Sequence, residues 1–73
     1  METIVTIIPI KEVWEQCKFR VDYGQLSVFG CSIEQVAQLL EEAVVFNRVN
    51  QNRININVQV IKIDECTFKV TEE

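Results

Sequence analysis

Residues 32–48 carry the one clear helical repeat in this sequence, and the rest of the chain has to fold around them. At about 100° per residue, apolar side chains gather on one half of the predicted helix: Ile33, Val36, Ala37, Leu39, Leu40, Ala43, Val44 and Phe46. Val45 and Val49 break this division, so the last turn either frays or contacts something else. An apolar arc this wide needs a sheet or a second helix beneath it.

Both ends of this helix have local signals. Ser32 is a favourable N-cap residue, and Gln35 follows three positions later, so the two predict a capping box. Cys31 and Val36 occupy the positions of a hydrophobic staple. The Asn-Gln-Asn segment at residues 50–52 suits termination, because Asn tolerates the left-handed conformation that helix ends often need.

The first predicted strand, residues 3–8, is apolar on both faces. Ile4 and Ile8 point one way, and Val5 and Ile7 point the other way. One face can contact the helix. The other face needs a second sheet, a second copy of the chain or a target, so this strand indicates association.

The next two strands form a predicted hairpin. Residues 17–23 alternate between apolar and polar side chains, and Gly24-Gln25 forms a two-residue turn in which Gly supplies a positive φ. The strand at residues 26–30 returns the chain to the helix. Phe29 lies on the face opposite the core, which indicates that the far side of the sheet is not fully solvated.

Two more strands follow the helix. Residues 54–60 alternate between apolar and amide side chains, and the pattern shifts phase at Val60-Ile61, which predicts a β-bulge. Asp64-Glu65 forms the last turn, and residues 66–71 form the closing strand. We therefore predict one α+β domain over residues 1–73, in the order β-β-β-α-β-β, with a mainly antiparallel sheet and the helix on one face.

One segment stays ambiguous. Residues 10–16 fit either a helical turn or a continued strand. Trp14, the single tryptophan, is either a lid over one end of the core or an exposed anchor for a partner, and it is the candidate hot spot because Trp is enriched at such positions.

Composition narrows the function. A 73-residue domain buries only about 60% of its unfolded surface, yet 48% of the residues are apolar, which favours a homo-oligomer, with a homodimer expected. The net charge of −4 argues against general nucleic-acid or anionic-membrane binding. Residues 4–10 are too short an apolar run to span a membrane and lack signal-peptide flanks, so we expect a cytoplasmic protein.

The sequence gives little support for catalysis or metal binding. The sequence has no His, which removes Ser-His-Asp and Cys-His arrangements, and its two glycines cannot form a phosphate loop. Cys17, Cys31 and Cys66 have no metal-site spacing, and we expect buried, reduced thiols. We predict no enzyme activity, no catalytic residues, no cofactor and no metal.

Two surfaces are candidates for binding. The first, the amide ladder, would hold a nucleotide, a signalling metabolite or an added strand, and consists of Arg48, Asn50, Asn52, Arg53, Asn55, Asn57 and Gln59. The second is the acidic helix face, which would meet a basic protein partner and consists of Glu34, Glu41 and Glu42. An ordinary solvated surface remains an alternative for each.

Residues 30–43, Gly-Cys-Ser-Ile-Glu-Gln-Val-Ala-Gln-Leu-Leu-Glu-Glu-Ala, resemble the strand-to-helix junction of HicB-type antitoxins. The resemblance covers about a fifth of the chain. It implies a partial ribonuclease-H-like sheet and helix, and a module that neutralises a basic toxin. The preceding hairpin lacks the family's usual sequence, and no DNA-binding segment follows the helix.

The first hypothesis is a small non-catalytic binding protein that occludes a partner as a homodimer. Its size and composition fit phage or mobile-element accessory proteins, including inhibitors of host defence. The alternatives are an oligomeric small-ligand binder that uses the amide ladder, and an antitoxin-like module.

Overall fold

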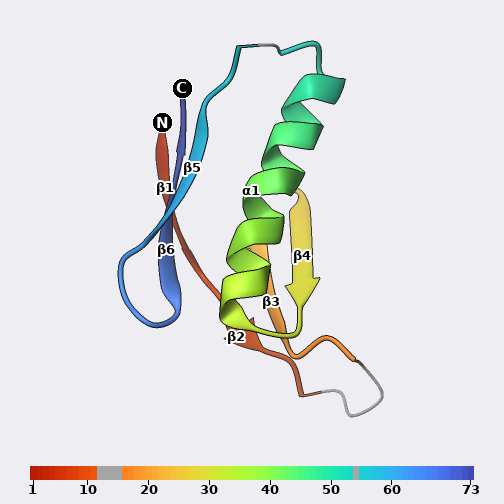
Figure 1. Cartoon of the computed structure of the whole chain (residues 1–73), viewed down its shortest axis with the longest axis vertical. Coiled ribbons are helices and arrows are strands. Elements are labelled where there is room, and N and C mark those ends of the chain that lie inside the picture. Colours follow the sequence, from red (N-terminus) through yellow and green to blue (C-terminus); the bar gives the residue numbers. More distant parts are fainter. Residues whose placement is uncertain (12–15, 54) are drawn as a thin grey trace.

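The first predicted strand is divided between two sheets. The computed structural model describes residues 1–11, 16–53 and 55–73. Its elements are β1 (Glu2–Thr6), β2 (Ile8–Pro9), β3 (Phe19–Tyr23), β4 (Leu26–Gly30), α1 (Ile33–Asn50), β5 (Val58–Lys62) and β6 (Thr67–Glu72) (Figure 1). The predicted α+β class, with one helix and antiparallel strands, is confirmed.

The described strands pair as two three-stranded sheets, in the orders β1-β6-β5 and β2-β3-β4. The predicted first strand is therefore divided, because the chain leaves one sheet at Thr6 and enters the other at Ile8. Ile7 lies between them, and its N–H donates to the carbonyl oxygen of Cys66 at 2.8 Å. All pairings between the described strands are antiparallel. The chain passes from β1 through Ile7 into β2 and so connects the two sheets.

Helix α1 packs on the inner side of both sheets, between β5 and the β3–β4 hairpin (Figure 1). Its fully buried side chains lie about one turn apart, at Val36, Leu40 and Val44. They contact apolar residues from both sheets, and the core is completed by Val5, Ile7, Val21, Tyr23, Val28, Val58, Phe68 and Val70. One helix thus closes the interior of a domain built from two small sheets.

The buried stripe of the helix is narrower than the predicted apolar arc. Leu39 and Phe46 were expected in the core, but both are exposed, Phe46 with a relative accessibility of 68%. The sheets cover only the strip of the helix surface that is centred on Leu40. Side chains about 100° or more away from Leu40 around the helix axis therefore face outward. Val45 and Val49 are exposed beside them, so the helix has a second apolar surface.

The predicted ends of the helix are close to those observed. The N–H of Gln35 donates to Ser32 Oγ at 3.1 Å, and Gln35 Oε1 accepts from the N–H of Cys31 at 2.6 Å. The capping box is therefore present, with its second bond moved one residue outward. Helix α1 continues to Asn50, and Asn52 follows in the left-handed conformation at φ 62°.

The hairpin forms where predicted. Tyr23 pairs with Leu26 across the turn, and Gly24 has a φ of +60°. Val21 and Val28 are buried, and Phe29 lies exposed on the opposite face. The alternation predicted for the first strand also holds, since Val5 and Ile7 are buried while Ile4 and Ile8 are 58% and 47% exposed.

The predicted bulge is wrong. The register of β5 against β6 runs unbroken through Val60↔Val70 and Ile61↔Lys69, so Ile61 stays on the outer face. The phase shift in the sequence reflects a strand that is apolar on both sides. Strand β5 also begins only at Val58, so residues 55–57 of the predicted strand lie before it, and Asn55 adopts a φ of 64°. Ile54, at the start of the predicted strand, lies outside the described residues.

Candidate functional site

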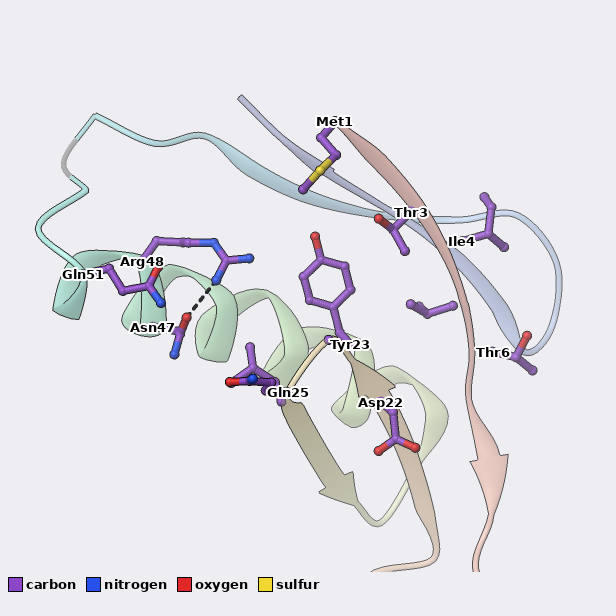
Figure 2. Close-up of a pocket in the computed structure, with 13 residues that line it drawn as sticks. Met1, Thr3, Ile4, Thr6, Asp22, Tyr23, Gln25, Asn47, Arg48 and Gln51 are labelled. Carbon is purple, nitrogen blue, oxygen red and sulfur yellow. Dashed lines mark hydrogen bonds between the residues drawn. The ribbon is translucent and has the colours of Figure 1, made fainter.

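A cleft opens where the two sheets diverge. The β2–β3 register ends at Ile8↔Arg20, and β1 then pairs with β6 instead of continuing along β3. The resulting cavity has a volume of about 630 Å³. It is lined by Met1, Thr3, Ile4, Val5, Thr6, Asp22, Tyr23, Gly24, Gln25, Leu26, Asn47, Arg48 and Gln51 (Figure 2).

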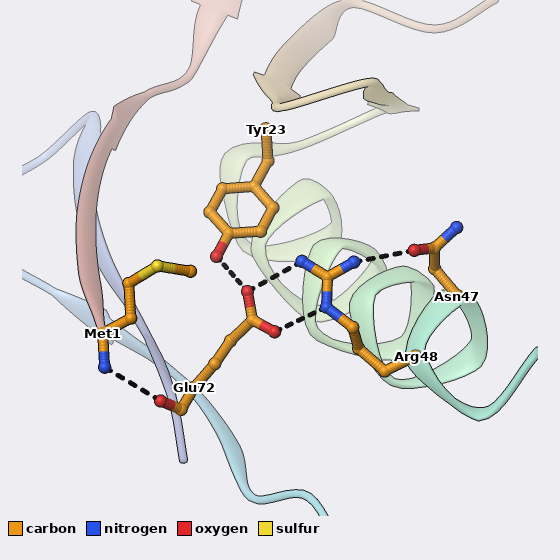
Figure 3. A network of polar contacts seen from close by, with 5 residues as sticks. All are labelled: Met1, Tyr23, Asn47, Arg48 and Glu72. Atoms are coloured by element: carbon orange, nitrogen blue, oxygen red, sulfur yellow. Dashed lines mark hydrogen bonds and ion pairs between the residues drawn. The ribbon is translucent and has the colours of Figure 1, made fainter. Parts of the chain in front are cut away.

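A polar network lies beside this cleft (Figure 3). Arg48, near the end of α1, donates from Nε and Nη2 to the two carboxylate oxygens of Glu72 at 2.7 and 2.9 Å. The hydroxyl of Tyr23 donates to the same carboxylate. Arg48 Nη1 also donates to Asn47 Oδ1 at 2.7 Å. The network joins the helix, the hairpin and the last strand, which are far apart in sequence.

The charges of this network are mutually stabilised. The hydrogen bonds from Arg48 hold the pKa of the Glu72 carboxyl below its ordinary value of 4.5, although partial burial opposes this shift. The hydrogen bond to Glu72 raises the pKa of Arg48. Burial is the main cause that raises the pKa of Tyr23, and the hydrogen bond to Glu72 raises it further. At neutral pH the network is thus an ion pair with a neutral phenol.

The pKa shifts of this network favour a structural role over a role in proton transfer. A general acid or base works best with a pKa near the working pH, and the three shifts described above move each group further from neutrality. The guanidinium of Arg48 is also neutralised by Glu72, so it offers less positive charge to a ligand than its sequence pattern indicated.

The structure brings together part of the amide ladder. Asn52, Arg53 and Asn55 share a cavity of about 510 Å³, which Glu72 and Glu73 also line. The remaining members lie elsewhere: Arg48 is in the network, Asn50 is exposed at the helix end, Asn57 exchanges backbone hydrogen bonds with Glu73, and Gln59 lies opposite Thr71. Ligand binding by this set stays a prediction.

The acidic helix face is exposed, as its polar residues suggested. Glu34, Glu41 and Glu42 are all on the surface of α1. Glu41 and Glu42 border a shallow apolar depression of about 470 Å³, together with Val45, Phe46 and Val49. Phe46 was expected in the core, so this depression was not predicted from the sequence. The signal that could have revealed it was the pair Val45 and Val49, which fall outside the apolar arc.

Three further findings bear on function. The predicted burial of the thiols is wrong: Cys17, Cys31 and Cys66 are free thiols, and Cys31 is exposed while the other two are half-buried. No helix in the described part of the chain is both long enough and apolar enough to cross a bilayer. Trp14 and the middle of the ambiguous segment 10–16 lie outside the described residues.

No protein-family model matches this sequence, and neither the curated proteins nor the solved structures contain a significant match to it.

Proposed function

We propose that this chain is a small, non-catalytic, cytoplasmic protein that binds a basic amphipathic segment of another protein on the outer face of α1. The binding would act by occlusion, because it covers the partner segment without changing it. The single observation that supports the proposal most is the exposure of Phe46 beside Glu41 and Glu42, which join no ion pair among the described residues.

The apolar part of this face has the geometry of a helix-binding seam. Leu39, Phe46 and Val49 follow the three- and four-residue spacing of one helical row, with Glu42 between them. All three apolar side chains are exposed. Contiguous exposed apolar surface commonly marks an interaction site in soluble proteins, and large aromatic side chains contribute most to such interfaces.

The negative charge on the outer face of α1 favours a basic partner. Within the described residues, Glu41 and Glu42 take part in none of the ion pairs, which join Arg20 to Asp22, Arg48 to Glu72 and Lys69 to Glu2. A second copy placed here would bring like charges together, whereas Lys and Arg on a partner helix would be attracted. A basic toxin or a nucleic-acid enzyme with such a helix would satisfy this chemistry.

A calorimetric titration tests the proposal. The probe is a synthetic Leu/Lys peptide with an amphipathic helical repeat, and the control is the same peptide with Glu in place of Lys. We expect the basic peptide alone to bind, and Phe46→Ser or the pair Glu41→Lys and Glu42→Lys to weaken binding at least about tenfold. Ile61→Ser, on the far side of the molecule, is the matched control. Equal binding of both peptides, or binding unaffected by Phe46→Ser, would refute the proposal.

A second candidate function rests on the cavity shared by Asn52, Arg53 and Asn55. We propose a nucleoside phosphate as its ligand, because amides can bind base edges and Arg53 can bind a phosphate. A thermal-shift screen with nucleoside mono-, di- and triphosphates should then raise the melting temperature, and Arg53→Ala should abolish the shift. A shift that persists in Arg53→Ala would place the ligand elsewhere, and no shift would reject this candidate.

A further inference from the structure

The outer face of the two sheets carries the same pattern twice. In one sheet, Lys69 lies between Ile4 and Ile61 on the neighbouring strands. In the other sheet, Arg20 lies between Ile8 and Phe29. Each row therefore consists of a central cation flanked by two exposed apolar side chains. Because all pairings are antiparallel and in register, both rows lie on the face opposite the helix.

Two ion pairs lie on this face. Lys69 Nζ lies 3.8 Å from Glu2 Oε2, and Arg20 Nη2 lies 2.7 Å from Asp22 Oδ1. The guanidinium of Arg20 also lies over the ring of Phe29, 5.4 Å from its centroid. The bond from Arg20 lowers the pKa of Asp22, so this carboxylate stays ionised and paired at neutral pH.

We infer that a second copy of this chain covers the outer sheet face, with the two sheets packed face to face. The two ion pairs on this face compensate their own charges within each copy, so the same surface can meet itself around a two-fold axis. In this arrangement four large apolar side chains are removed from solvent: Ile4, Ile8, Phe29 and Ile61. The helix face differs in this respect, because its carboxylates would repel a second copy. The two surfaces therefore have different occupants.

Face-to-face packing also fits the direction of the strands. Exposed strand side chains stand roughly perpendicular to the sheet, so the isoleucines of each copy can interdigitate, as they do between the layers of a β-sandwich. In this dimer the helices lie on the two outer sides. Each copy keeps Glu41, Val45 and Val49 of α1 open for the basic partner. At the edge of β4 the two surfaces adjoin, because Phe29, Leu39 and Phe46 line one depression.

Sedimentation equilibrium over a range of protein concentrations tests the inference. We expect a monomer–dimer equilibrium, and we expect the double variant Ile4→Glu and Ile61→Glu to weaken dimerisation at least about tenfold. Each new carboxylate lies opposite Lys69 on its own sheet, where it can pair in the monomer, so the variant should remain folded. Val49→Ser, on the helix face and outside the depression that Phe29 lines, is the matched control and should leave the dimer intact.

Isotope-filtered NOEs from a mixed labelled and unlabelled sample supply a second readout that needs no variant. The methyl groups of Ile4 and Ile61 should show intermolecular contacts, and the buried Ile7 should show none. A wild-type protein that is monomeric at all concentrations would overturn the inference. So would a dimer that persists in the Glu variant, or one that Val49→Ser disrupts. Loss of peptide binding with an intact dimer would instead affect only the function proposed for α1.

Discussion

Arg48 and Glu72 form a bidentate ion pair that fastens the end of the helix to the last strand. Their side chains are 17% and 11% exposed, and Tyr23 adds a hydroxyl from the hairpin to the same carboxylate. The pair thus joins parts of the chain that have no backbone hydrogen bonds to one another. Helix and strand termini tend to open first, and this contact holds one of each in place.

We expect Arg48→Met to lower the free energy of unfolding by about 2 kcal/mol, because it leaves a partly buried carboxylate without its charged partner. The double variant Arg48→Met and Glu72→Leu should lose less than the two single variants together, since no charge is left unpaired. Urea denaturation measures all three. The exposed pair of Lys69 and Glu2 is the control, and Glu2→Gln should change stability by less than about 1 kcal/mol.

The same contact predicts a dependence of stability on pH. The pKa of Glu72 is lower in the folded chain than its ordinary value of 4.5, so its contribution is fully present above that value and is lost as the pH falls through the folded pKa. Urea midpoints measured between pH 7 and pH 3 should therefore decrease on the acid side, and Glu72→Gln should decrease less steeply. Parallel curves for the two proteins would contradict this assignment.

The helix should divide into structural and surface positions. Leu40 is fully buried, so Leu40→Ala should cost about 3 kcal/mol through lost burial and the cavity left behind. Phe46→Ala removes a largely exposed side chain and should change stability by less than about 0.5 kcal/mol. Thermal denaturation of the two variants checks this contrast. A large loss in Phe46→Ala would mean that this side chain supports the fold and is not reserved for a partner.

Gly30 should tolerate no larger side chain. A Cβ at this position would lie 2.9 Å from Val36 Cγ2 and 2.9 Å from Gln35 Oε1, directly beneath the first turn of α1. We expect Gly30→Ala to destabilise the protein by about 1–3 kcal/mol through overpacking. Gly24→Asn is the matched control, because its Cβ would meet open space and Asn accepts a positive φ. Similar unfolding midpoints for the two variants would count against the close packing at Gly30.

Local features of this fold could be predicted from sequence, and long-range ones could not. The cap at Ser32, the turn at Gly24 and the alternation of Ile4 and Val5 each depend on neighbouring residues, and each is observed. The division of the first strand depends instead on which partner each half meets, β6 or β3. Apolar patterning gives both halves the same appearance, so the sequence predicted one strand in one sheet.

The candidate sites show the same limit. The polarity of Glu41 and Glu42 predicted an exposed acidic face, because charged side chains seldom lie in a core. The contact between Arg48 and Glu72 links residues 24 positions apart and has no local signature, so Arg48 was interpreted as a ligand-binding residue. The width of the buried stripe on α1 could not be read from helical periodicity, because it depends on how far the two sheets reach around the helix.

The single residue that separates β1 from β2 has a consequence for shape. Ile7 is almost completely buried and its N–H is bound to the carbonyl oxygen of Cys66, so it holds the junction between the two sheets in place. The rows centred on Lys69 and Arg20 lie on opposite sides of that junction. A side chain inside the core thus sets where one outer row ends and the other begins.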